Sequence, residues 1–122
     1  VLDHQADVVW AVVRDAGSIA NWFPAMSASE ITGITRTVTL GDGSKIIEDV
    51  VTIDDDLRRL QYTVTGGDLP VTSHLGTVDV IDLGDGRSLL VYGTDIEPAE
   101  MAEAFDAAIG EAVASLNAYL NS

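Results

Sequence analysis

The chain has no cysteine, and among its 122 residues only six are Lys or Arg and three are proline. Without cysteine it has neither a disulfide framework nor thiolate chemistry, so we expect a cytoplasmic protein. Twenty Asp and Glu residues bring the net charge to −14. A surface of that charge repels nucleic acid and anionic lipid, and we expect neither as a partner. No apolar run approaches the ~18 residues of a membrane helix, which predicts no integral membrane association.

Hydrophobic residues make up 47% of the chain, enough for a packed core and too many for a disordered segment. A length of 122 residues suits one domain and is too short for two. We therefore expect residues 1–122 to form a single domain.

The most regular segment is 98–120, PAEMAEAFDAAIGEAVASLNAYL. Its large apolar residues recur every three or four positions, which predicts one amphipathic helix of about six turns. Pro98 is tolerated in the first turn because its missing N–H has no partner there. Such a helix is unstable alone in water, so a sheet should cover its apolar face.

Two shorter helices are predicted before it. The first covers 6–15, ADVVWAVVRD, and the second, SIANWFP, starts with Ser18 as its cap and ends before Pro24. From about Ser29 the hydrophobic period changes to two, which is typical of strands. The predicted strands are 29–40, 44–53, 59–65, 71–83 and 88–96. Tight turns between them imply an antiparallel meander.

The turn at 41–43 fixes the register of the first predicted hairpin. If Leu40 pairs with Ser44, Arg36 lies opposite Glu48, and even-numbered residues share one apolar face.

The turn at 84–86 does the same for the last hairpin. Pairing Leu83 with Arg87 sets Val80 opposite Leu90 and His74 opposite Ile96. The polar side chains predicted to face inward are Arg36, Glu48, Tyr62, His74 and Tyr92, with Thr94 as a further candidate.

The order of elements resembles the polyketide cyclase/dehydrase and lipid-transport family. That family belongs to the START and birch-pollen-allergen-like superfamily, whose fold is called the helix grip. The segments that carry the resemblance are ADVVWAVVRD, SIANWFP, RTVTLGDG, IIEDV, QYTV, DLPV, DGRSLLVYG and the C-terminal helix. The resemblance implies an α+β fold, in which a curved antiparallel sheet of six or seven strands wraps around the long C-terminal helix beside two short N-terminal helices.

The sequence departs from this family in two places. Only 1–5 precede the first helix, where relatives open with a full strand. The stretch between Met26 and Arg36 is also short, because SEITGITRT stands where relatives have a strand, a turn and the next strand. Either this hairpin is reduced or residues are missing from it.

The resemblance further implies a cavity between the sheet and the C-terminal helix that binds a small hydrophobic ligand such as a lipid, polyketide or aromatic compound. Trp22, Phe23 and Met26 would lie at its mouth. Met101, Phe105 and Ile109 would form the helix wall, and Tyr62, His74 and Tyr92 would present polar tips inside.

Several of these residues also have simpler structural interpretations. Arg36 and Glu48 could orient a ligand or form an ion pair that satisfies only itself. His74 could be a general acid or base, or a hydrogen-bonded structural residue. The inward tyrosines could bind a ligand oxygen or belong to the core. The segment Trp22-Phe23-Pro24 could be a gate or a helix end packed onto the sheet.

The sequence offers no convincing metal site or cofactor motif. The two histidines are too few for a zinc site, and the turn Asp54–Asp55–Asp56 lacks the glycine and alternating ligands of a calcium loop, so it should be a solvated turn. We expect no metal and no cofactor, and the pattern makes no prediction of oligomeric state.

For function, the sequence favours a carrier or sensor of a hydrophobic ligand, because no nucleophile, metal set or carboxylate pair stands out. One alternative is a polyketide cyclase or dehydratase that uses His74 with Tyr62 or Tyr92 as acid and base and Arg36 to stabilise an enolate. Another is a protein-interaction domain with a collapsed cavity.

Overall fold

A six-stranded antiparallel sheet and one long helix dominate the computed structural model, which describes residues 1–122. The strands pair in the order β1-β2-β3-β4-β5-β6. They are β1 (Met26–Thr32), β2 (Thr35–Leu40), β3 (Lys45–Asp54), β4 (Arg59–Gly67), β5 (Ser73–Gly84) and β6 (Arg87–Glu97). The helices are α1 (Ala6–Val13), the 3₁₀ turns η1 (Ala16–Asn21) and η2 (Ala99–Met101), and α2 (Ala102–Leu120).

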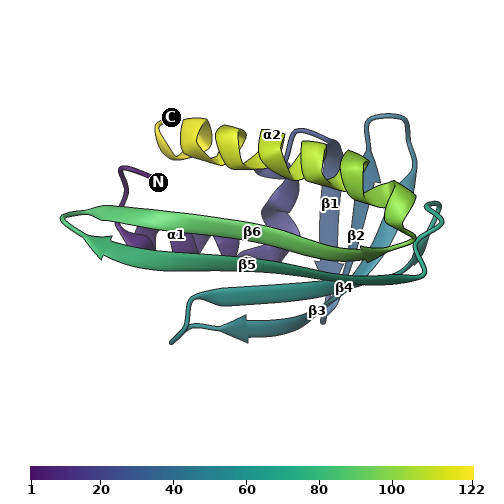
Figure 1. The fold of residues 1–122 in the computed structure, drawn as a ribbon, viewed down its shortest axis with the longest axis horizontal. Coiled ribbons are helices and arrows are strands. Elements are labelled where there is room, and N and C mark those ends of the chain that lie inside the picture. The colour runs from purple at the N-terminus through teal and green to yellow at the C-terminus, as the bar shows by residue number, and fades with distance from the viewer.

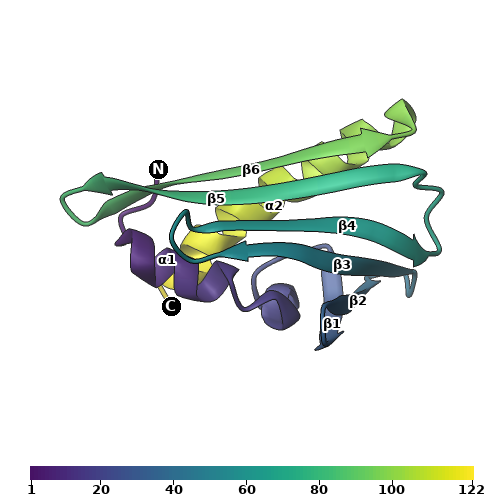
Figure 2. The same cartoon turned by 90° about the horizontal axis from the view of Figure 1, so that it is seen from below.

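The sheet is strongly curved and grips α2 on its concave face. In Figure 1, β5 and β6 run lengthwise beneath α2, whereas β1 and β2 run steeply across the same view. Figure 2 shows α2 behind the strands, and it shows α1 and the helical turn that follows α1 along one side of the sheet. The predicted α+β helix-grip architecture is confirmed. No helix of this structure combines the length and the hydropathy of a membrane span.

All three predicted helical segments contain helical structure, but their bounds and, for the second, the helix type differ from the prediction. The C-terminal helix begins as a 3₁₀ turn, so Pro98 precedes that turn instead of lying in the first turn of α2. The first helix stops at Val13, two residues early. The second is a 3₁₀ turn that starts at Ala16, and Ser18 lies inside it without capping it. A segment of six residues is too short to sustain regular α-helical hydrogen bonding by itself.

The predicted single strand 29–40 is wrong, because it is a complete hairpin. Thr32 pairs with Thr35 across a two-residue turn, and Gly33 has a φ of +62° at its first position. That conformation suits glycine and matches the right-handed twist of the strands. The short stretch SEITGITRT therefore contains the end of β1, the turn and the start of β2.

The predicted registers place the inner face correctly. Arg36 lies opposite Glu48, and Val80 lies opposite Leu90. The pairing of Leu83 with Arg87 is wrong, since Gly84 pairs with Arg87 and the ladder shifts by one residue between Asp82 and Gly84. This irregularity lies next to the turn, so the residues beyond it keep their expected faces.

The short N-terminal segment 1–5 contributes one bridge to the sheet. Leu2 and Ser88 exchange two backbone hydrogen bonds, of 2.8 and 3.0 Å. The two chain ends lie close together, because His4 Nε2 and Asn121 Oδ1 are 2.8 Å apart. The rest of the outer edge of β6 has no strand beside it.

The turn between β3 and β4 is more than a solvated loop. Asp55 accepts hydrogen bonds from Trp10 Nε1 at 2.8 Å and Arg14 Nε at 2.9 Å, which ties α1 to this end of the sheet. These bonds, from Arg14 first and Trp10 second, hold the pKa of Asp55 below its usual value.

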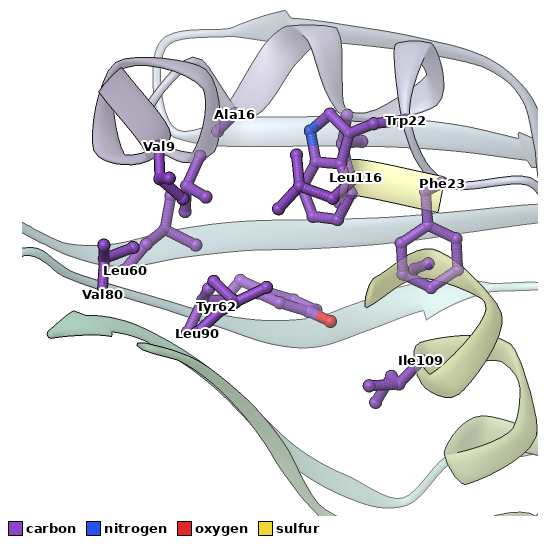
Figure 3. Close-up of a cluster of buried hydrophobic side chains, with 14 of the residues drawn as sticks. Val9, Ala16, Trp22, Phe23, Leu60, Tyr62, Val80, Leu90, Ile109 and Leu116 are labelled. Atoms are coloured by element: carbon purple, nitrogen blue, oxygen red, sulfur yellow. The ribbon is translucent and has the colours of Figure 1, made fainter. Parts of the chain in front are cut away.

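Buried hydrophobic side chains fill the space between the sheet, α1 and the C-terminal part of α2 (Figure 3). Val9, Leu60, Val80 and Leu116 are each 2% exposed or less. Full burial of such side chains is worth about 1.5–3 kcal/mol each. The core is therefore closely packed at this end of the molecule.

Candidate ligand-binding site

A cavity of about 230 Å³ lies between the sheet and the N-terminal part of α2. Twelve of its 13 lining residues are hydrophobic, and the exception is Glu48. The others are Phe23, Ala25, Met26, Leu40, Ile46, Tyr62, Leu69, Met101, Ala104, Phe105, Ala108 and Ile109. The wall thus presents apolar surface with one charged group.

The two halves of α2 differ in what they cover. Ala112 and Leu116, toward its C-terminus, are 0% exposed and pack into the core. Phe105 and Ala108, toward its N-terminus, are only partly buried and face the cavity. The same apolar stripe that the sequence predicts therefore serves as core at one end and as cavity wall at the other.

Glu48 is held from behind by Arg36. Arg36 Nε donates to Glu48 Oε1 at 2.7 Å, and Arg36 Nη1 donates to the carbonyl of Ala16 at 3.1 Å. The two residues are 1% and 3% exposed. Burial raises the pKa of the Glu48 carboxyl, and the neighbouring Arg36 charge opposes that rise.

Tyr62 carries the second polar group that reaches the cavity wall. Its ring lies under the Arg36 guanidinium, whose Cζ is 4.7 Å from the ring centroid. Its hydroxyl lies 2.5 Å from the hydroxyl of Tyr92. In Figure 3 this hydroxyl points toward the side where Phe23 and Ile109 lie.

Both tyrosine hydroxyls are neutral at physiological pH. Burial is the main cause of a raised pKa in each, to about 12 for Tyr92 and well above the ordinary value of 10.0 for Tyr62. They can exchange hydrogen bonds with a ligand, but neither is easily deprotonated.

His74 lies behind the cavity wall and does not line it. Its Nδ1 accepts a hydrogen bond of 3.2 Å from the backbone N–H of Val64, while its buried Nε2 has no partner. The ring packs 5.2 Å from that of Tyr62 and 5.9 Å from that of Phe105. Burial, followed by the Arg36 charge, lowers the pKa of His74 and favours the neutral ring.

The predicted mouth residues divide into two groups. Phe23 and Met26 line the cavity, but Trp22 does not. Trp22 is 3% exposed and packs against Phe23 and Tyr92, with ring centroids 6.0 and 6.5 Å apart. Its indole therefore belongs to the core.

Of the residues predicted for ligand binding, the cavity wall contains Phe23, Met26, Glu48, Tyr62, Met101, Phe105 and Ile109. Trp22, Arg36, His74 and Tyr92 lie behind it. The site residues absent from the prediction are Ala25, Leu40, Ile46, Leu69, Ala104 and Ala108. Two features of the sequence could have identified some of these residues. Leu40 and Ile46 lie on the predicted inner face of the sheet, and the alanines of α2 lie between the large apolar residues of that helix.

A curved antiparallel sheet that grips a long helix over an apolar cavity defines the helix-grip class of proteins. The chain belongs to the polyketide cyclase/dehydrase and lipid transport family, whose model matches residues 1–121. A comparison with curated protein sequences finds no match.

Solved structures share this fold at low sequence identity. XoxI from Bacillus cereus is similar with a TM-score of 0.90 and 22% identity, over 99% of this chain and 91% of that one. An uncharacterised Bacillus thuringiensis protein has a TM-score of 0.88 and 21% identity, over 99% and 94%. A START superfamily protein from Mycobacterium smegmatis has a TM-score of 0.82 and 17% identity, over 98% and 92%.

Proposed function

We propose that the protein binds a small hydrophobic molecule in the cavity between the sheet and α2, as a carrier or sensor. The observation that carries this proposal is the composition of the cavity wall, which is apolar except for one carboxylate beside one phenol. Ligand pockets typically combine such an apolar lining with few polar groups that fix orientation. Family membership supports the same class of ligand.

The open cavity also argues against the interaction-domain alternative. A collapsed interior would leave no space beneath α2, whereas about 230 Å³ remains between Phe105 and the sheet. Side chains as large as Leu and Phe already line this space without filling it.

A cyclase or dehydratase is the second candidate, and the position of Tyr62 favours it. Tyr62 lines the cavity and its hydroxyl contacts that of Tyr92, so the pair could polarise a bound carbonyl by donating a hydrogen bond. His74 is less suited to act as a base, since its Nδ1 already accepts the Val64 N–H and its ring lies behind the wall. We therefore place binding ahead of catalysis.

Native mass spectrometry of the freshly purified protein, repeated after denaturing extraction, tests the proposal. A released hydrophobic compound would support binding, and a mixture of lipids would favour a carrier. A bare chain that also fails to bind a hydrophobic fluorescent probe would contradict it. If a reaction is found, the cyclase or dehydratase candidate predicts that Tyr62→Phe abolishes turnover while ligand binding survives.

A further inference from the structure

The carboxylate of Glu48 faces the cavity with one oxygen free. Its Oε1 accepts the hydrogen bond from Arg36, and the Arg36 Nη2 also lies 2.7 Å from that same oxygen. Its Oε2 accepts none of the hydrogen bonds in the structure, although the residue is only 3% exposed and lines the cavity. This oxygen is not among the fully buried polar atoms that lack a partner, so it is open to a hydrogen-bond donor on a molecule bound in the cavity.

No positively charged side chain lines the cavity. Arg36 lies behind the wall, where its Nε donates to Glu48 and its Nη1 donates to the Ala16 carbonyl, while its buried Nη2 has no hydrogen-bond partner. The Arg36–Glu48 pair is neutral as a whole, so a ligand carboxylate would bring an uncompensated negative charge beside Glu48. Such a charge in a low-dielectric site is strongly unfavourable.

A neutral hydroxyl behaves in the opposite way. It can donate to Glu48 Oε2 in a charge-assisted hydrogen bond, which is about twice as strong as a neutral one. We propose that Glu48 selects apolar ligands that carry a hydroxyl at their buried end and rejects those that carry a free carboxylate. This inference rests on the proposed function, because it assigns the ligand class of the same cavity.

The cavity volume sets the size of a suitable probe. At about 30 Å³ for each water-sized group, 230 Å³ holds roughly eight non-hydrogen atoms. 1-Octanol and octanoate are close to this size and differ only in the end group, so they form a matched pair.

The test is calorimetric titration of the protein with each probe at pH 7.5, together with displacement of a hydrophobic fluorescent dye. We expect 1-octanol to bind at least about tenfold more tightly than octanoate. The hydroxyl of 1-octanol gains a charge-assisted hydrogen bond to Glu48, whereas the carboxylate of octanoate would lie beside a like charge. Octanoate binding as tightly as 1-octanol would overturn the inference and leave the cavity proposal intact. If neither probe binds and the dye is not bound either, both proposals fail.

Two variants, each of which removes one negative charge, test whether the ligand preference depends on Glu48. Glu48→Gln should narrow or reverse the preference, because the wall loses its carboxylate and Arg36 becomes an unpaired cation. Glu103→Gln removes an exposed charge beside the lining residue Ala104 and should leave the preference unchanged. An equal effect of both variants would assign the selectivity to overall charge and contradict the role of Glu48. Should Glu48→Gln not fold, the comparison of the two probes on the unmodified protein still decides the inference.

Discussion

The ring of Tyr62 lies against Gly76, the residue directly opposite it across β4 and β5. A Cβ at position 76 would come within 2.6 Å of Tyr62 Cζ. The ring has little room to withdraw, because the Arg36 guanidinium is 4.7 Å from its centroid and the His74 ring is 5.2 Å away. The position of the Tyr62 hydroxyl in the cavity wall therefore depends on the absence of a side chain at 76.

Gly76→Ala should destabilise the protein by about 1–3 kcal/mol, because the added methyl group overpacks the buried ring. Urea unfolding followed by tryptophan fluorescence measures the change. Gly93→Ala, in the neighbouring strand β6 with open space around it, is the matched control and should change stability far less. Equal losses from the two variants would show that the Tyr62 ring moves freely.

Arg36→Met should reduce the free energy of unfolding by about 3–5 kcal/mol, since it leaves the Glu48 carboxylate buried and unpaired. The double variant Arg36→Met with Glu48→Leu removes both charges and should recover much of that loss. Chemical denaturation of the single and double variants gives the coupling between them. Simple additivity of the two single effects would argue against an interacting pair.

The pH dependence of the free energy of unfolding should show the lowered pKa of His74. Its folded-state pKa lies below the ordinary value of 6.5, so below about pH 6.5 the unfolded chain takes up a proton that the folded state resists. The stability that neutral His74 contributes is complete above that pH and is lost as the pH falls through the folded-state pKa. The stability difference between the unmodified protein and His74→Gln should therefore shrink from pH 8 to pH 5. A difference that stays constant over this range would contradict the lowered pKa.

Ala108→Leu should fill the cavity from its helix wall and weaken binding of a hydrophobic fluorescent dye by roughly tenfold. Ala107→Leu adds the same atoms at the adjacent exposed position, which does not line the cavity, and should leave dye binding unchanged. Fluorescence titration of both variants makes the comparison. If both bind the dye as the unmodified protein does, the dye site lies elsewhere.

The alternation of the strands predicted the inner face well, because a sheet covered on one side tolerates only one assignment of its residues. The glycine-rich turns then placed Arg36 opposite Glu48 and Val80 opposite Leu90. The family resemblance left a reduced hairpin at Gly33 open, but the strand pattern did not show it, since its turn is only two residues long and interrupts the alternation very little. The register shift between Asp82 and Gly84 was also not predicted, because it lies next to the turn and hardly changes the alternation of the strand.

The division of the inward residues between core and cavity could not be predicted from the pattern. Trp22 and Phe23 are adjacent and equally hydrophobic, yet only Phe23 lines the cavity. Likewise Leu116 and Phe105 lie on one helical stripe, one in the core and one at the cavity wall. What separates them is where each side chain lies relative to the space under the N-terminal part of α2, and the hydrophobic period carries no information on that position.

The unequal support of α2 has a consequence for its dynamics. Its C-terminal turns are anchored by Ala112 and Leu116, so their amide protons should exchange with solvent only when the whole protein unfolds. The turns around Phe105 rest on an unfilled space and should exchange through local opening at lower free energy. A molecule that fills this space would supply the missing contacts, and the amide protons of the N-terminal turns of α2 would then record occupancy as slower exchange.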